Sequence, residues 1–340
     1  MKKILSVFLL LSLVLTLAAG CGGSRNGGDA TSPANPTDPA VPGSTDLKIV
    51  CTVFPQYDWV RNILGDLAQT ADLTMLLDTG TDLHSYQATA EDFVKLSGCD
   101  LFIYVGGVSD MKWVPDALAT AGNIPSLSLL EALGSAAKEE AEVAGMQPEE
   151  EEEEEGALDE HVWLSLRNAQ TLVTAICDAL CKADPANADT YRANAEAYNK
   201  KLKSLDTSFT VAVESAGYKT MLVGDRFPFR YLCDDYGITP YAAFSGCSAE
   251  TEASFETLAG LSKIVDELGL PAVVVTETAD QSIAKTIIEN TQQKNQRIVV
   301  MNAMQNITKE KVAEGVTYLG LMQENLAAIN SALNYMPAQN

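Results

Sequence analysis

Short apolar segments rich in β-branched residues alternate with amphipathic segments from residue 47 onward. The apolar segments predict buried strands and the amphipathic ones predict helices. In chain order they are a strand at 47–53, a helix at 57–67, a strand at 73–77, a helix at 89–96 and a strand at 101–105. Residues 89–92 (TAED) match the capping-box pattern, which supports a helix start there. Strands that alternate with helices predict a parallel sheet.

A second series of the same kind follows a long helical segment. Residues 188–214 contain few strong helix breakers. At about 1.5 Å per residue they would form a helix of about 40 Å, which is long enough to join two lobes. Four more strands are predicted at 220–223, 239–244, 272–276 and 297–301. The sequence therefore predicts an α/β protein of two lobes, each with a parallel sheet flanked by helices, bridged by one long helix.

The start of the chain has the pattern of an export signal. Lys2 and Lys3 precede an uncharged apolar run at 4–19, and residues 17–21 (LAAGC) resemble a bacterial lipobox, in which Cys21 becomes acylated. The alternative is a soluble export signal in which Cys21 is an ordinary residue. Residues 22–46 are mostly Gly, Ser, Pro, Asp and Thr, which predicts a flexible spacer. An acyl chain would hold the protein at a membrane surface without a spanning helix.

The charge of the chain narrows the possible partners. It has 23 Lys and Arg against 46 Asp and Glu, a net charge of −23. Such a field repels phosphate backbones, so we expect no nucleic-acid partner, and a cation fits better. Only 2 His and 7 Cys occur, which disfavours a Cys-rich zinc module or a disulfide-dense scaffold.

Several polar residues follow the predicted strands. In open α/β sheets ligands bind beyond the carboxyl ends of the strands. His84, Asp225, Glu277 and Asn302 come after four of these strands, and His161 lies just before a predicted helix. A single loop histidine is more often structural than a ligand, but both histidines of the chain occur at such places. Two imidazoles with one or two carboxylates form a coherent site for zinc or manganese.

The sequence also resembles the metal-binding lipoproteins that supply ABC importers of zinc and manganese. The resemblance rests on segments in the same order along the chain: 49–57 (IVCTVFPQY), 77–86 (LDTGTDLHSY), 96–105 (LSGCDLFIYV), 161–169 (HVWLSLRNA), 248–256 (SAETEASFE) and 318–326 (YLGLMQENL). It implies two α/β lobes joined by one helix, with a single divalent metal in the cleft between them.

The same resemblance implies a ligand set. His84 and His161 fall on the first two ligand positions of the family. Asp225 is the acceptable donor near the third position, since the neighbouring Arg226 stays charged and has no acceptor. For the fourth ligand we expect Glu277, with Asn302 as the alternative or water in its place. Glu277 could instead be a helix N-terminal charge.

These inferences divide the chain into five parts. We expect a lipoprotein signal peptide at 1–20, the lipidated cysteine and linker at 21–46, an N-terminal metal-binding lobe at 47–185, the connecting helix at 186–216 and a C-terminal metal-binding lobe at 217–336. Within the first lobe, an acidic loop is expected at about 138–157. Its run of seven glutamates at 149–155 is typical of a solvated, disordered face. The resemblance implies a low-affinity collector of cations there.

Six cysteines remain besides Cys21. We interpret Cys51, Cys99, Cys177, Cys181, Cys233 and Cys247 as small buried hydrophobic residues. Outside the cell a disulfide is allowed, and Cys233 with Cys247 is the least implausible pair.

We therefore predict a monomeric, extracytoplasmic receptor, anchored to the membrane at the bacterial cell surface by Cys21. It would capture Zn²⁺, or next in preference Mn²⁺, and deliver it to the permease and ATPase of an ABC importer. It would not be an enzyme. One alternative is a surface metallohydrolase, but the sequence has no HExxH, no G-x-S-x-G and no phosphate loop. The other is an adhesin or an iron-chelate receptor on a similar chassis. An iron-chelate receptor would need basic residues, which are scarce near the presumed cleft.

Overall fold

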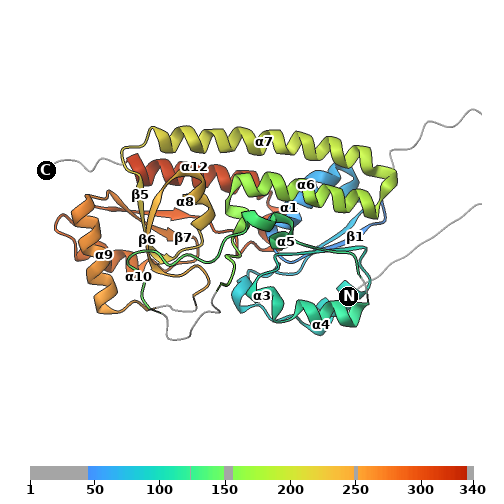
Figure 1. Ribbon diagram of the computed structural model, residues 1–340, viewed down its shortest axis with the longest axis horizontal. Coiled ribbons are helices and arrows are strands. Elements are labelled where there is room, and N and C mark those ends of the chain that lie inside the picture. The colour runs from blue at the N-terminus through green and yellow to red at the C-terminus, as the bar shows by residue number, and fades with distance from the viewer. Residues whose placement is uncertain (1–44, 123, 149–155, 249–251, 335–340) are drawn as a thin grey trace, which may run out of the picture. The chain divides into compact units, whose positions relative to one another are not determined.

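Two parallel sheets form the centre of the fold in this computed structural model, which describes residues 45–122, 124–148, 156–248 and 252–334 (Figure 1). All of them belong to one compact unit. The first sheet has the order β2-β1-β3-β4 and the second the order β6-β5-β7-β8. All neighbouring strands run parallel. The predicted fold, with two α/β lobes bridged by a long helix, is confirmed.

The first sheet consists of β1 (Lys48–Cys51), β2 (Asp72–Met75), β3 (Leu101–Tyr104) and β4 (Ser126–Ser128). Three of these lie within or beside the predicted segments. The sequence did not predict β4, because it is only three residues long and two of them are serines. Its pairing with β3 supplies the order that such a short polar segment cannot specify alone.

The second sheet consists of β5 (Thr220–Arg226), β6 (Thr239–Phe244), β7 (Ala272–Thr276) and β8 (Arg297–Met301). The bounds of the last three agree with the prediction. β5 continues three residues beyond its predicted end, past a register shift between Val223 and Arg226. The extension places Asp225 and Arg226 within the strand rather than after it.

Helices flank the first sheet and set the loops that follow its strands. They are α1 (Phe54–Leu64), α2 (Ala90–Ser97), α3 (Val108–Met111), α4 (Val114–Ala121), α5 (Leu129–Leu133) and α6 (Leu166–Ala183). The first begins three residues before its predicted start. Pro55 occupies its first turn, and the Gln56 side chain accepts hydrogen bonds from the backbone of Thr52 and Val53. These contacts stabilise the early start.

The helix α7 (Ala188–Glu214) connects the lobes over 27 residues. It packs against α1 and α6 on one side of the molecule and against α8 (Arg230–Tyr236) and α12 (Tyr318–Asn334) on the other (Figure 1). Its buried side chains recur every three or four residues, which forms one apolar stripe along the helix: Tyr191, Ala195, Tyr198, Leu202, Leu205, Phe209 and Val213. A continuous stripe of this length explains why one straight helix spans both lobes.

Helices of the second lobe also reach the first. Besides α8 and α12, the lobe contains α9 (Phe255–Leu268), α10 (Ser282–Glu289) and α11 (Lys309–Ala313). At the start of α12 the Tyr318 ring packs edge-on against Trp59 of α1, with the ring centroids 5.1 Å apart. The Tyr318 backbone N–H donates to the buried Asp58 carboxylate at 3.1 Å. The last helix, α12, therefore packs against the first helix, α1.

A segment between α5 and α6 crosses from the first lobe to the second. We call residues 138–148 the strap. Its base is an isolated antiparallel bridge between Glu139 and Leu158. Near its far end the Gln147 N–H donates to the carbonyl of Ala243 in β6 at 2.9 Å, and Gly145 lies against Leu261 of α9. Because β6 is an edge strand, the strap covers part of an otherwise unpaired edge.

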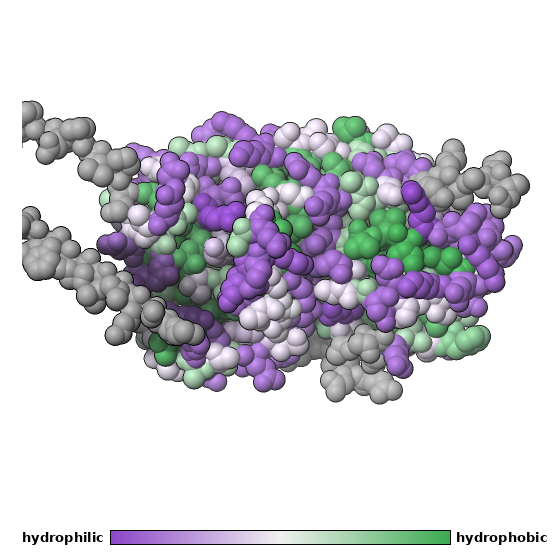
Figure 2. Space-filling view, turned by 180° about the vertical axis from the view of Figure 1, so that it is seen from behind, coloured by the Kyte–Doolittle hydropathy of each residue, from purple (hydrophilic) through white to green (hydrophobic). Residues whose placement is uncertain are grey.

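The surface seen from behind is mostly hydrophilic, and hydrophobic residues gather in a few areas, the largest on the right of the view (Figure 2). No helix in the described part of the chain combines the length and apolarity needed to cross a membrane. The predicted signal peptide, Cys21 and the linker up to residue 44 lie outside the described residues. Thr45 is already buried and its hydroxyl donates to Asp184 at 3.0 Å, so the chain joins the fold there.

The capping box at the start of α2 allows a test of local stability. The Thr89 hydroxyl accepts from the Asp92 N–H, and the Asp92 carboxylate accepts from the Thr89 N–H at 2.9 Å. Thr89→Ala removes one of these bonds, so we expect it to lower the free energy of unfolding by about 1 kcal/mol in urea denaturation. The control is Thr207→Ala at an exposed position inside α7, which should change stability little. Equal effects of the two substitutions would contradict this role for Thr89.

Candidate metal centre

His84 lies in a short 3-10 helix, Leu83–Ser85, in the loop after β2. The side chain of Asp82 caps this turn by accepting from the His84 N–H at 3.0 Å. On the ring, Nδ1 lies 3.1 Å from Glu160 Oε2 and 3.0 Å from the Ser109 hydroxyl. Glu160 and Ser109 therefore hold the Nδ1 side of the ring, and Nε2 points away from these two partners.

His161 is fully buried at the start of a 3-10 turn, Val162–Leu164. The Asp159 carboxylate lies 2.8 Å from the His161 backbone nitrogen and 3.0 Å from its ring Nδ1. One carboxylate thus fixes both the backbone and the ring. Burial alone would lower the pKa of His161, but the charge and hydrogen bond of Asp159, together with Glu140 and Glu160, raise it.

The two rings present their other nitrogens to the same point. His84 Nε2 and His161 Nε2 are 3.2 Å apart. An ionised carboxylate can only accept, so the Nδ1 atoms are assigned as the N–H donors and both Nε2 atoms as acceptors. Two ligands about 2.1 Å from a tetrahedral zinc ion lie roughly 3.4 Å apart. The observed separation is close to that expected for two imidazoles on one ion.

Gln305 completes this contact from the second lobe. Its side-chain Nε2 lies 2.9 Å from the Nε2 atoms of both His84 and His161. The amide donates to two acceptors that would otherwise face each other without a hydrogen between them. Gln305 therefore occupies the position where a cation would satisfy the same two lone pairs.

Cys247 is the third potential metal ligand of the group. The ligand atoms of His84, His161 and Cys247 all lie within 4.8 Å of one another. Cys247 follows β6, and its N–H donates to Glu140 Oε1 of the strap at 2.9 Å. Burial, together with the charges of Glu140, Glu160 and Asp159, raises the pKa of its thiol.

Gly246 allows this close approach. A Cβ at that position would lie 2.9 Å from the Phe227 carbonyl, 3.1 Å from His161 Cε1 and 3.2 Å from Glu140 Oε1. The loop that presents Cys247 is thus pressed against the His161 ring, and only a residue without a side chain fits there.

Carboxylates surround the histidines without joining the group of ligand atoms. Burial alone would raise the pKa of Glu160. The hydrogen bond and charge of His84, together with hydrogen bonds from Ser109, outweigh burial and lower this pKa. The guanidinium of Arg226 lies 3.0 Å from Asp82. The carboxylates of Asp159 and Glu160 place negative charge directly beside the two rings. The surroundings of the histidines therefore suit a cation better than an anion.

The structure places the predicted oxygen ligands in other hydrogen bonds. The Asp225 carboxylate accepts from the backbone N–H of Thr276 at 3.1 Å and from its hydroxyl. Glu277 Oε2 accepts from the Ala303 N–H at 2.7 Å, and burial raises the pKa of its carboxyl. Neither belongs to the metal-ligand group formed among the described residues. The Asn302 side-chain oxygen accepts from the Met304 N–H at 2.8 Å.

Several contacts between the lobes hold the loops of the site together. The Trp163 ring N–H donates to the Ala303 carbonyl at 2.8 Å, which places the loop of Gln305 beside His161. On the other side, the Asn306 amide donates to the Gly80 carbonyl at 2.8 Å. Two segments that are far apart in the sequence therefore meet at the histidines.

Sequence reasoning missed Cys247 and Gln305, although both lie just past a predicted strand. Cys247 comes three residues after the end of β6, and Gln305 four residues after the end of β8. The rule that pointed to Asp225 and Asn302 could have reached them. The sequence instead favours a small buried hydrophobic role for Cys247, with Cys233 as a possible disulfide partner. The six described cysteines are all free, so the structure does not form that disulfide.

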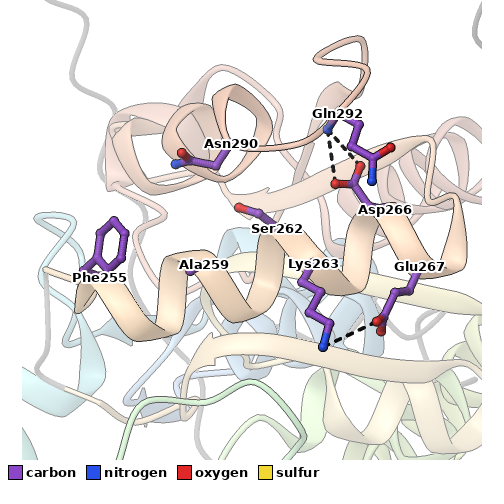
Figure 3. Close-up of a pocket in the computed structure, with 8 residues that line it drawn as sticks. All are labelled: Phe255, Ala259, Ser262, Lys263, Asp266, Glu267, Asn290 and Gln292. Carbon is purple, nitrogen blue, oxygen red and sulfur yellow. Dashed lines mark hydrogen bonds and ion pairs between the residues drawn. The ribbon is translucent and has the colours of Figure 1, made fainter.

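A cavity of about 470 Å³ lies elsewhere, beside α9 and the segment after α10 (Figure 3). Its polar groups are largely occupied by one another. The Lys263 ammonium lies 3.5 Å from Glu267, and Asp266 accepts from the Gln292 N–H at 3.0 Å. The lining residues are Phe255, Ala259, Ser262, Lys263, Asp266, Glu267, Asn290 and Gln292. They include none of the groups around the histidines.

Gly246 offers a direct test of the site geometry. Gly246→Ala should weaken Zn²⁺ binding measured by competition with a chromophoric chelator, because the added methyl group displaces the Cys247 loop or the His161 ring. Gly260→Ala in α9 is the matched control, since a Cβ there meets nothing within 4 Å. Unchanged Zn²⁺ affinity in the first variant would show that the loop does not contribute to the site.

Comparison with known proteins identifies the family. The sequence matches the family model described as zinc-uptake complex component A, periplasmic, over residues 49–332. It is 32% identical over 289 residues to the zinc-binding lipoprotein AdcA of Streptococcus pneumoniae strain R6. This alignment covers 83% of this chain and 55% of that protein. The chain is 28% identical over 341 residues to the high-affinity zinc uptake system protein ZnuA of Bacillus subtilis, which covers 98% of each.

A solved structure agrees with these matches. The Zn(II)-bound ZnuA-like domain of S. pneumoniae AdcA aligns with a TM-score of 0.66 at 29% identity, covering 86% of this chain and all of that domain. The chain spans about half the length of the AdcA relatives that it matches. These relatives are named as zinc-binding and zinc-uptake proteins. Because the family model covers most of the chain, the protein belongs to the ZnuA family of zinc-uptake components.

Proposed function

We propose that this protein is an extracytoplasmic receptor that binds one Zn²⁺ between its lobes and delivers it to an ABC importer. The observation behind the proposal is the 3.2 Å separation of the His84 and His161 Nε2 atoms, each on a ring whose Nδ1 faces a carboxylate. Carboxylates in this position orient an imidazole and increase its basicity toward a metal. The names of the relatives support zinc as the ion and uptake as the process.

Zinc fits these donors better than manganese. Imidazole nitrogen suits zinc, whereas manganese prefers oxygen-rich sites, and zinc also binds more tightly at most such sites. One carboxylate oxygen of Asp225 accepts from Thr276, and one of Glu277 accepts from Ala303. The proposal therefore keeps His84 and His161 as ligands and ranks zinc ahead of manganese.

Gln305 is proposed as a weak oxygen ligand. Rotating its side-chain amide by half a turn exchanges Nε2 for Oε1 with little change of shape. The amide would then present its oxygen to the ion. Bonds from the ion to the two imidazoles would replace the hydrogen bonds that the amide donates to them. A neutral amide oxygen binds zinc weakly, which favours release of the ion to the importer.

Replacing the histidines tests the site. His84→Ala and His161→Ala should each weaken Zn²⁺ binding by at least about tenfold in calorimetric titration, since the loss of a ligand should cost no less than the loss of a group behind it. Glu277→Gln is the control, because it removes a charge near the site and leaves both imidazoles intact. Wild-type Zn²⁺ affinity in both histidine variants would refute the site. A large loss in Glu277→Gln would instead support the ligand set expected from the sequence.

Membrane anchoring is proposed from the lipobox-like segment that ends at Cys21, and a relative is named a lipoprotein. Mass spectrometry of protein from the native membrane should find acyl chains on a chain that begins at Cys21. Cys21→Ala should remove this modification and release the protein from the membrane fraction. An unmodified wild-type N-terminus would refute the anchor without affecting the metal site. The acidic run at 149–155, proposed as a weak collector of cations, lies outside the described residues.

A further inference from the structure

We propose that Cys247 is a protein ligand of the metal, so that the receptor binds zinc through two imidazoles and one thiolate. This inference rests on the proposed function and adds a donor of a different chemical class to it. The thiol and both imidazoles approach the same point from three separate loops, and their ligand atoms lie within 4.8 Å of one another.

The loop of Cys247 is built for this approach. The Glu140 carboxylate holds its backbone at 2.9 Å, and Gly246 removes the side chain that would separate the loop from His161. In a tetrahedral site a sulfur about 2.3 Å and a nitrogen about 2.1 Å from zinc lie roughly 3.6 Å apart. A small inward movement of the loop therefore brings the sulfur to bonding distance.

The other cysteines provide a useful contrast. Cys177 and Cys181 have their sulfur atoms 4.0 Å apart on one buried face of α6, where they fill space in the core. Cys51 and Cys233 are likewise buried. Cys247 is only half-buried, and among the described residues it alone of the cysteines joins a group of potential metal ligands. Packing alone does not explain its position.

Metal binding requires only that Cys247 loses one proton. Zn²⁺ displaces the thiol proton of Cys247, a Zn–S bond forms as the S–H bond breaks, and the proton passes to water. No oxidant or reductant takes part. The two imidazoles bind as neutral ligands, so their Nδ1–H groups stay in place. A soft thiolate also discriminates between metals, since it favours zinc over manganese more strongly than a carboxylate would.

Cobalt substitution tests the sulfur directly. Co²⁺ bound to the wild-type protein should show an intense thiolate-to-metal charge-transfer band in the near ultraviolet. Cys247→Ser should abolish this band and weaken Zn²⁺ binding by at least about tenfold, because the hydroxyl is a much poorer ligand. Thermal unfolding of the metal-free variant should match that of the metal-free wild type, which separates loss of a ligand from loss of the fold.

Alkylation provides a second readout. Zn²⁺ should protect Cys247 of the full chain from a small maleimide, scored by peptide mass spectrometry. Cys99 is the internal control, because it is also half-buried but lies just before β3, outside the group of ligands. Its modification should be the same with and without Zn²⁺.

The results separate this inference from the proposed function. Suppose that His84→Ala loses Zn²⁺ binding, while Cys247→Ser keeps wild-type affinity and an unchanged charge-transfer band. This result would overturn the thiolate ligand but leave the proposed receptor function intact. Wild-type affinity in the histidine variants would overturn both. Equal protection of Cys99 and Cys247 would also count against direct coordination, since it would indicate a general closing of the protein.

Discussion

Two buried carboxylates hold two imidazoles so that their free nitrogens face each other. Asp159 and Glu160 are neighbours in the sequence, but they act on different rings, Asp159 on His161 and Glu160 on His84. Two acceptor nitrogens at 3.2 Å repel unless a donor or a cation lies between them. The amide of Gln305 provides the donor, and a metal ion could bind the same two nitrogen lone pairs in its place. Much of the surrounding structure serves to maintain this contact.

The contact depends on the way that the lobes are joined. The long helix α7 and the return of α12 onto α1 fix the two sheets in one compact unit. Trp163 then bonds to the loop of the second lobe that contains Gln305. Because the proposed ligands come from both lobes, a small movement of one lobe against the other would change the separation between the imidazoles of the first lobe and the Cys247 thiol of the second. Binding and release of an ion can therefore be coupled to the fit between the lobes.

The strap adds a second link between the lobes near the site. It leaves the first lobe beside His161, places Glu140 against the Cys247 backbone and continues along the edge of β6. The run of glutamates follows directly in the sequence. The strap thus links the first lobe to the loop of the proposed thiolate ligand.

Local patterns in the sequence determined the elements of this protein. The bounds of β6, β7 and β8 and the capping box of α2 could be predicted because they depend on runs of apolar residues and on neighbours three residues apart. The short, serine-rich β4 could not, since its order comes from its pairing with β3.

The same distinction applies to the site. His84 and His161 stood out as the two histidines of the chain, and the tertiary structure brings them together. The role of the other donors depended on long-range contacts. Thr276 donates to one oxygen of Asp225 and Ala303 to one oxygen of Glu277, whereas the folding of separate loops brings Cys247 and Gln305 to the imidazoles. The sequence by itself thus determined the fold and the first two candidate ligands, and only the tertiary structure decided which other side chains meet them. The reason is that a side chain's partners across the fold depend on packing that no local pattern records.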